Sequence, residues 1–389
     1  MNDSAIPELS GLRLAALGAG ALGTLGLVAG AFIDPAQFFH SYLYGFVYWV
    51  GLGIGCLGIV MIYHLTGGGW GVAVRRLLEA GAGTLPLMAA LFVPLLFGLH
   101  QIYEWTHTDV MMADEVLRLK LPYLNVPFFI ARAVVYFAAW IALAHFLTRW
   151  SREQDRTGDP RYAVSMRKLS GGGIVLLAFT VTFAVFDWVM SLEPHWFSTI
   201  FGMLFLAGQA LGALAFVIAV AYLLARRPEF GRVFAPTILN DLGNLLLAFV
   251  MIWAYLSFSQ LLIIWAGNLP EEIPWYLHRI AGGWNVIAMA LAVFYFVVPF
   301  FVLLGRNNKR QHHRLAAIAV AIIVARLLDL FFLIMPEFYK DRLGVHWLDV
   351  AAILGIGGLW ITMFLWRLGA QPLLAQNDSE LAPALARRQ

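Results

Sequence analysis

The run FSTIFGMLFLAGQALGALAFVIAVAYLL, residues 197–224, holds 28 consecutive residues without a charged side chain. A helix rises about 1.5 Å per residue, so this run is longer than the roughly 30 Å hydrocarbon core of a bilayer. Hydrophobic residues make up 61% of the 389-residue chain and charged residues 13%, which excludes an ordinary water-soluble domain. The sequence therefore predicts an all-α integral membrane protein.

Nine further stretches have the same character. Apolar windows of about 20 residues predict ten membrane spans in all, at residues 11–33, 42–65, 85–105, 125–149, 170–191, 197–224, 237–266, 281–304, 314–335 and 347–368. The loops between them are too short to form a core of their own. We expect one membrane domain, residues 1–370, and a polar tail, residues 371–389, which is either disordered or a docking segment and to which we assign no chemistry.

The basic residues fall on one side of this arrangement. The termini and the loops after the second, fourth, sixth and eighth spans carry 19 Lys and Arg residues, whereas the five other loops carry five. Because basic loops stay on the cytoplasmic side of a membrane, both termini are predicted to be cytoplasmic. The net charge of +3 is explained by this bias, so no nucleic-acid partner is expected and the lipid bilayer is the expected environment.

Four charged residues inside the predicted spans stand out: Arg132, Asp187, Arg326 and Asp329. Charge within a bilayer is costly, so such residues usually face the interior of a helix bundle and mark proton, ion or ligand paths. Arg132 needs a carboxylate, and Asp187 or Glu104 lies at a matching depth. Arg326 and Asp329 are three residues apart, a spacing at which they can pair within one helix. A structural tie and a functional gate both remain open for each pair.

The outer half of the bundle is the first candidate for proton handling. His100 and Glu104 are four residues apart, which places them on one helical face near the outer boundary, at the level of Arg132 and Asp187. We take these residues as an outer proton cluster, with an interfacial hydrogen-bonded pair as the structural alternative for His100 and Glu104. The pair in the ninth span is the weaker functional candidate, because it can neutralise itself.

The seventh span carries a polar stripe. Asp241, Asn244, Tyr255 and Ser259 fall within a narrow sector of the helix and span its length. Asp241 is a candidate cytoplasmic entrance for protons, or alternatively a residue that caps the start of the helix. Residues 245–254 offer no titratable side chain, so this helix alone cannot complete a proton path.

Cofactor ligands are scarce. Two G-x-G-x-x-G runs, at residues 18–23 and 53–58, lie inside membrane spans, where small residues serve close helix packing rather than dinucleotide binding. The single cysteine, Cys56, excludes cysteine-ligated iron–sulfur clusters and covalent haem. His64 and His145 share one depth, but no second pair of ligands accompanies them for haem. We expect no metal and no cofactor on this chain.

Two long motifs carry a resemblance to a known family. The run FDWVMSLEPHWFSTIFG at residues 186–202, with AYLSFSQ at 254–260 and NLPEEIPWYLHR at 268–279, is similar to the ActF family, the NrfD-like (polysulfide-reductase-type) membrane subunit of bacterial alternative complex III. The likeness in length and ten-span topology covers nearly the whole chain. It implies two four-helix bundles, spans two to five and six to nine, with spans one and ten peripheral.

The resemblance also implies a setting in the bacterial cytoplasmic (inner) membrane. There the chain would be a multi-pass subunit, without a redox centre of its own, of a respiratory quinol:electron-acceptor oxidoreductase that takes the place of the cytochrome bc1 complex. Implied partners are a sister NrfD-like membrane subunit, an iron–sulfur protein, multihaem and monohaem c-type cytochromes and, in some assemblies, a terminal oxidase. Haem c and iron–sulfur clusters would reside in those partners, with quinol as the substrate of the complex.

Three functions are therefore open. The leading hypothesis is a cofactor-free subunit that supports assembly and conducts protons during quinol oxidation. The first alternative is a quinol-binding catalytic subunit in its own right, with Arg132, Asp187 and His195 as polar partners of the quinol head. The second is a secondary transporter, suggested by ten spans with charges at the midplane, although no matching pair of broken helices supports it.

Overall fold

The computed structural model describes residues 9–340 and 342–386, and the chain is an all-α membrane protein. Ten helical segments of this part are long and apolar enough to cross a membrane. They are α1 (Ser10–Ile33), α2 (Pro35–Thr66), α3 with α4 (Gly69–Ala82, Leu85–Phe97), α8 (Val126–Thr157), α9 (Arg161–Trp188), α10 (Phe201–Leu224), α12 (Pro236–Gly267), α14 with η4 and α15 (Trp284–Leu291, Ala292–Val297, Val298–Leu304), α17 (His312–Ile334) and α18 (Trp347–Gly369).

Short helices fill the connections. They are α5 (Leu99–Ile102), η2 (Glu104–Thr106), α6 (Thr108–Ala113) and α7 (Glu115–Lys120) in one long loop, then η3 (Met190–Leu192), α11 (Pro228–Gly231), α13 (Pro274–Ile280), α16 (Arg306–Lys309), η5 (Met335–Glu337) and α19 (Leu381–Ala386). Local signals fix several helix ends. The side chains of Asp34 and Asn125 accept hydrogen bonds from backbone N–H groups in the first turns of α2 and α8, and Gly158 ends α8 at a left-handed φ of 69°.

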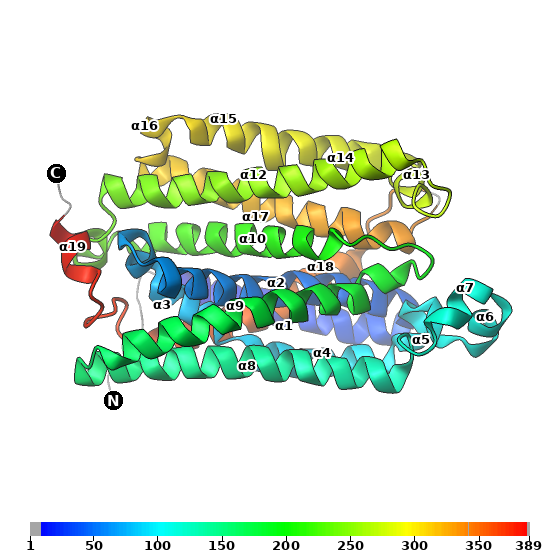
Figure 1. Cartoon of the computed structure of the whole chain (residues 1–389), viewed down its shortest axis with the longest axis horizontal. Helices are drawn as coiled ribbons and strands as arrows, with labels where there is room; N and C mark the ends of the chain where they lie inside the picture. The colour runs from blue at the N-terminus through cyan, green and yellow to red at the C-terminus, as the bar shows by residue number, and fades with distance from the viewer. Residues whose placement is uncertain (1–8, 341, 387–389) are drawn as a thin grey trace.

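Helix α2 is the centre of the fold. It packs against α3, α4 and α9 on one side, against α10 on another and against α18 on a third (Figure 1). Helices α2, α3–α4, α8 and α9 form one bundle, and α10, α12, α14–α15 and α17 form the second, with α10 in contact with both α2 and α9. Helices α1 and α18 pair with each other on the outside of α2, so the implied division into two bundles and two peripheral spans agrees with the contacts.

Glycines allow the closest of these contacts. A Cβ atom on Gly23 would lie 2.2 Å from the backbone of Gly355, and one on Gly20 would lie 3.0 Å from that of Gly358. Gly55 of α2 meets the backbone oxygen of Gln209 in the same way, at 2.2 Å. Glycines of both G-x-G-x-x-G runs therefore serve helix packing, as predicted.

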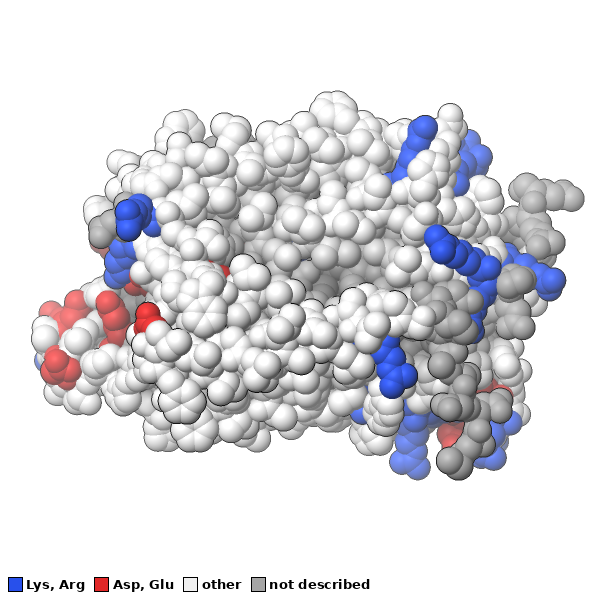
Figure 2. Space-filling model, turned by 180° about the vertical axis from the view of Figure 1, so that it is seen from behind, with Lys and Arg blue, Asp and Glu red and all other residues white. Residues whose placement is uncertain are grey.

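Charge separates along the long axis of the molecule. Figure 2 shows most Lys and Arg side chains gathered at one end, most acidic side chains with a few basic ones at the other, and a broad band almost without charge between them. The tail helix α19 lies at the basic end (Figure 1). This is the distribution that the positive-inside rule associates with a cytoplasmic basic end.

The bounds of the third span need correction. It begins at Gly69, well before residue 85, and its long helix ends at Phe97 rather than at residue 105, because the chain breaks at Gly98 against the ring of Phe39. Of the two alternatives for the tail, the structure shows the docking segment as far as residue 386. It folds back over the basic end and forms α19; Asn377 donates a hydrogen bond to the backbone oxygen of Asp155, and Asp378 accepts one from the hydroxyl of Tyr63. Residues 387–389 of the predicted tail lie outside the described part.

Candidate functional site

An ion pair lies near the middle of α17, inside the second bundle. The guanidinium of Arg326 donates to the carboxylate of Asp329 one turn further along the same helix, and each residue is only 3% exposed. The intrahelical pairing allowed by the three-residue spacing is thus confirmed. We call these two residues the central pair.

The neighbouring helix α10 makes room for the central pair. A Cβ atom on Gly208 would lie 2.3 Å from Nη1 and 2.6 Å from Cζ of Arg326, so only glycine leaves space for the guanidinium here. The charge also lies 5.5 Å from the ring centroid of Phe205, within cation–π range. Gly212, one turn further along α10, lies only at ordinary van der Waals distance from the side chain of Arg326.

Polar side chains from three other helices surround the central pair. Trp253 of α12 lies beside Asp329, and its ring centroid is 4.4 Å from that of Tyr295 on η4. Tyr295 and Tyr48 of α2 both lie close enough to Arg326 to interact electrostatically with its guanidinium. All three aromatic residues are buried.

Two polar atoms beside the central pair make no well-formed hydrogen bond to the described part of the chain. They are the indole Nε1 of Trp253 and the hydroxyl of Tyr295. Buried polar atoms are rarely left unsatisfied, and ordered water is their usual partner inside proteins. Tyr295 also belongs to η4, a π-helical turn, and such turns occur frequently at functional sites.

The chemistry available here is proton exchange at a carboxylate. Asp329 is the only acidic side chain of the central pair, and its proton affinity depends on how closely Arg326 approaches it. Unpartnered donors and acceptors around the pair offer binding positions to water, which can carry a proton to or from the carboxylate. The sequence analysis ranked this pair below the outer cluster because it can neutralise itself; neither the surrounding polar atoms nor the glycine cradle could be recognised from the sequence.

The outer pair of charges is more completely satisfied. Nε and Nη2 of Arg132 each donate to Asp187 at 2.8 Å, and the hydroxyl of Tyr136 adds a third hydrogen bond at 2.8 Å. Nη1 of Arg132 donates to the backbone oxygen of Tyr123 at 2.9 Å, and its guanidinium stacks between the rings of Tyr123 and Phe128. The predicted partnership of Arg132 with Asp187 is confirmed, and this bidentate geometry favours a structural tie between α8 and α9.

The other outer residues do not join that tie. His100 and Glu104 do not share a helical face, because the chain turns extended at Tyr103 between α5 and η2. His100 is exposed and its ring contacts His107, whereas Glu104 faces Lys340 at 3.9 Å.

His195 likewise has a partner other than Arg132 and Asp187. Its Nε2 lies 2.8 Å from Oδ2 of Asp114 in the loop between α6 and α7, and the imidazole is largely exposed. Sequence spacing could not foresee this contact, because the loop returns across the acidic end of the molecule. The hypothesis of a quinol head bound by Arg132, Asp187 and His195 stays a prediction.

The polar stripe of the seventh span faces away from the second bundle. Tyr255 of α12 is 69% exposed, Ser259 is half-buried, and Asn244 accepts a 2.6 Å hydrogen bond from Nζ of Lys309 on α16. Asp241 is half-buried near the basic end, where a cytoplasmic entrance was predicted. The stripe therefore meets lipid or another protein along most of its length, while Trp253 of the same helix faces inward.

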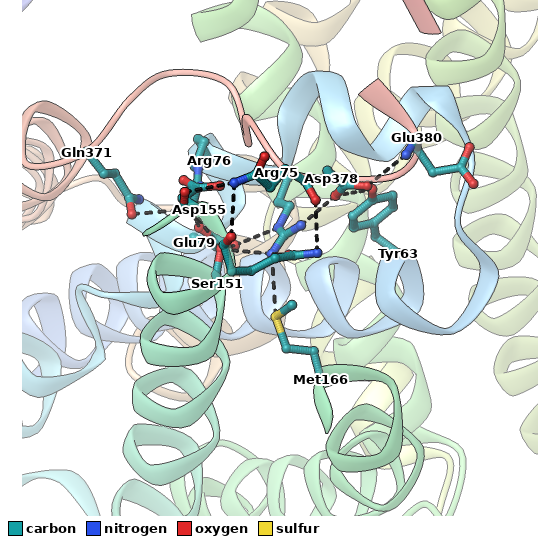
Figure 3. A network of polar contacts seen from close by, with 12 residues as sticks. Tyr63, Arg75, Arg76, Glu79, Ser151, Asp155, Met166, Gln371, Asp378 and Glu380 are labelled. Carbon is teal, nitrogen blue, oxygen red and sulfur yellow. Dashed lines mark hydrogen bonds and ion pairs between the residues drawn. The ribbon is translucent and has the colours of Figure 1, made fainter. Parts of the chain in front are cut away.

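A further buried network at the basic end escaped the sequence analysis. Arg75 and Arg76, taken as topology signals, are each 1% exposed, and both donate to Glu79, at 2.9 and 2.6 Å (Figure 3). Ser151 of α8 donates to Glu79 at 2.6 Å and accepts from both arginines. Asp155 pairs with Arg76. We call these five residues the basic-end network. The three- and four-residue spacings to Glu79 were its only signal in the sequence.

The tail completes the basic-end network. Oδ2 of Asp378 accepts from Nη1 of Arg75 at 2.5 Å and from the hydroxyl of Tyr63 at 2.7 Å (Figure 3). Gln371 reaches Arg76 at 3.4 Å. A segment without assigned chemistry thus supplies the carboxylate that balances a buried arginine.

A second missed contact anchors the loop between the seventh and eighth spans. Arg279 of α13 is 2% exposed and donates to Glu193 at 2.8 Å and to the backbone oxygen of Leu333 at 3.0 Å. Its guanidinium also lies 3.7 Å from the ring centroid of Trp275. All of these but Leu333 belong to the two long motifs, which therefore meet in space.

No cluster of three or more His, Cys, Asp or Glu side chains suited to a metal ion occurs among the described residues. Comparison of the sequence with known protein families and with curated proteins finds no match. The functional interpretation therefore rests on the geometry above and on the motifs themselves.

Proposed function

We propose that this chain is a cofactor-free membrane subunit of a respiratory quinol:electron-acceptor oxidoreductase, and that it handles protons at the central pair. The observation that carries the proton role is the central pair itself, a buried Arg326–Asp329 contact bordered by buried polar atoms of Trp253 and Tyr295 that make no well-formed hydrogen bond to the described part of the chain. Membrane proteins rarely keep ionisable groups at this depth unless the groups act.

Proton handling at the central pair needs two states of Asp329. When the carboxylate is ionised, Arg326 neutralises it in a medium of low dielectric constant. When a proton binds, the guanidinium loses its counter-charge and favours a new partner, for which the hydroxyl of Tyr295 lies nearby. Protonation and side-chain position are thereby coupled, which is the requirement for a gate.

The routes to the central pair run through more than one helix. Asp241 lies near the basic end of α12 and Trp253 near its centre, about 18 Å apart at 1.5 Å per residue. No titratable side chain occupies α12 between them, so protons from the cytoplasmic side would travel through water held by neighbouring helices. The outer cluster of Arg132 and Asp187 then acts as a tie that fixes the first bundle.

The respiratory setting rests on the two long motifs and their resemblance to the ActF family. Partners would be a sister NrfD-like subunit, an iron–sulfur protein and c-type cytochromes, which would carry the haem c and the clusters, in a bacterial inner membrane. The outward polar stripe with Tyr255 suits contact with such a membrane partner. The test of this setting is co-purification: a tagged chain, extracted in mild detergent, should bring down haem c and quinol-oxidising activity, and its purification alone would contradict the setting.

The proton role has its own test. In the purified complex reconstituted in vesicles, Asp329→Asn should lower the number of protons moved per quinol while quinol oxidation continues. Because Asn leaves Arg326 unpaired, the double variant Arg326→Gln/Asp329→Asn serves as a second probe that removes both charges at once. Asp187→Asn controls for the loss of a buried carboxylate elsewhere. Unchanged proton stoichiometry in both central variants would leave the subunit as a scaffold.

A further inference from the structure

A cavity of about 330 Å³ opens at the basic end, between the junction of α3 with α4, the last turns of α8 and the end of α18. It is separate from the central pair and shares none of its residues. Its polar wall carries Arg149, Arg152 and Arg367, with His145 and Thr148 beside them. This is a concentration of positive charge at the level where a membrane helix meets the cytoplasmic interface.

The three arginines of this cavity have no carboxylate partner among the described residues. Arg152 and Arg367 lie close enough to repel each other, and Nε of Arg367 is buried without a hydrogen-bond partner. The two acidic residues of the wall are already engaged: Glu79 accepts from Arg75 and Arg76 in the basic-end network, and Glu153 binds the exposed Arg156.

This differs from the rest of the basic end. The equally basic pair Arg75 and Arg76 is matched by three carboxylates, so the fold does supply counter-charges where it needs them. In the cavity, the like charges of Arg152 and Arg367 lie close together, and the described part of the chain supplies no counter-charge to them. Such an arrangement is stabilised when an anion from outside occupies the space between the guanidinium groups.

The cavity has an apolar wall that continues toward the membrane. Ala82, Pro86, Ile141 and Ala144 line its deeper side. The side chain of Arg367 passes over Gly83, where a Cβ atom would lie 3.3 Å from its Cδ, which places this arginine beside the junction of α3 with α4. A ligand that fits both walls has an anionic head and a hydrocarbon body.

We propose that this cavity binds the phosphate of an anionic phospholipid of the cytoplasmic leaflet, held by Arg149, Arg152 and Arg367, with an acyl chain along Pro86 and Ile141. Basic pockets between membrane helices on the cytoplasmic side suit such head groups, and a guanidinium binds phosphate through two parallel hydrogen bonds. The bound lipid supplies the counter-charge that the chain itself lacks.

The test uses the full-length protein in nanodiscs with a spin-labelled or fluorescent phosphatidylglycerol, compared with the same label on phosphatidylcholine. The wild type should prefer phosphatidylglycerol, and Arg152→Gln/Arg367→Gln should reduce that preference by about fivefold for each arginine removed. Arg161→Gln/Arg314→Gln is the matched control: it removes the same charge from exposed positions at the same end and should keep the preference.

Two further arms decide between lipid, soluble anion and misfolding. Arg152→Lys/Arg367→Lys keeps both positive charges and should prefer phosphatidylglycerol more strongly than the Gln double variant does. This comparison distinguishes an effect of the lost charge from an effect of misfolding. Inorganic phosphate at millimolar concentration should fail to displace the labelled lipid. The proposal is overturned if the wild type shows no selectivity, if the Gln variant matches it, or if inorganic phosphate competes fully, which would make the cavity a site for a soluble anion.

Discussion

Replacing Gly208 by alanine places a methyl group where the guanidinium of Arg326 now lies. The new Cβ would be 2.3 Å from Nη1 and 2.6 Å from Cζ, distances at which the arginine must move. Arg326 is buried and bound to Asp329, so its movement strains the central pair. Overpacking in a protein interior costs about 1–3 kcal/mol, and breaking a buried ion pair costs about 3–5 kcal/mol. We expect Gly208→Ala to lower the free energy of unfolding by about 1–3 kcal/mol.

A matched control lies one turn further along the same helix. A Cβ atom on Gly212 would meet Cγ of Arg326 and Cδ2 of Leu52 at 3.5 Å each, which is ordinary van der Waals contact. Alanine is favoured over glycine inside a helix by about 0.5–1 kcal/mol. Gly212→Ala should therefore be neutral or slightly stabilising, although both variants add the same methyl group to α10.

The chain carries its own reporter for this comparison. Cys56 is its single cysteine and is fully buried in α2, so a thiol-reactive fluorescent dye reports unfolding at one site. Dye labelling of the purified full-length chain during a thermal ramp should occur at a lower temperature for Gly208→Ala than for Gly212→Ala and the wild type. Equal stability of the two alanine variants would refute the claim that α10 holds the guanidinium in a fixed position.

Other contacts give three further expectations. Arg132→Gln leaves the fully buried Asp187 without its bidentate partner and should destabilise the chain by about 3–5 kcal/mol, measured by the same dye assay. Asp378→Asn removes the tail carboxylate from the basic-end network and should cost about 1.5–3 kcal/mol. A hydrogen bond from His195 holds the pKa of the Asp114 carboxyl below its usual value. This contact therefore stabilises the folded state above about pH 3.9, and its contribution is lost as the pH falls through the lower pKa of the folded state. Hydrogen exchange in the α6–α7 loop should rise as the contact is lost.

Controls for these variants come from exposed or neutral positions. Asp159→Asn breaks only a surface contact with Arg161 and should change stability by less than about 1 kcal/mol. Asp114→Asn should abolish the acid-dependent rise in loop exchange. A stable Arg132→Gln variant with a raised KM for quinol would contradict the structural role of the outer cluster and revive quinol binding there. An Asp378→Asn variant as stable as wild type would mean that the tail contact is incidental.

The fold follows from the sequence because hydrophobic length is a local property. The run at residues 197–224 and the nine similar runs each specify a span without reference to the others, and each of the ten helical segments overlaps its predicted run. The bounds differ at the second, fourth and fifth spans and most of all at the third. There the apolar window missed Gly69–Ala82, since Arg75, Arg76 and Glu79 lower its hydropathy although all three are buried.

The site was only partly predictable, since it depends on contacts between distant segments. The partners of Arg132 and Arg326 were found because a buried charge needs a counter-charge and few were available. The cradle at Gly208 and the unpartnered Tyr295 could not be found, because nothing in the sequence states which face of α10 meets α17. His100 and Glu104 failed as a pair because spacing of four implies one face only in a continuous helix, and the helix ends first.

The central claim is that Asp329 gains and loses a proton while the complex oxidises quinol. Redox-triggered infrared difference spectroscopy of the intact complex measures this directly, since a protonated carboxyl group has a carbonyl band that an ionised one lacks. We predict a carboxyl band that appears or disappears on turnover, that is absent in Asp329→Asn and that persists in Asp187→Asn. A spectrum in which Asp329→Asn leaves every carboxyl band unchanged would contradict the proposed proton site.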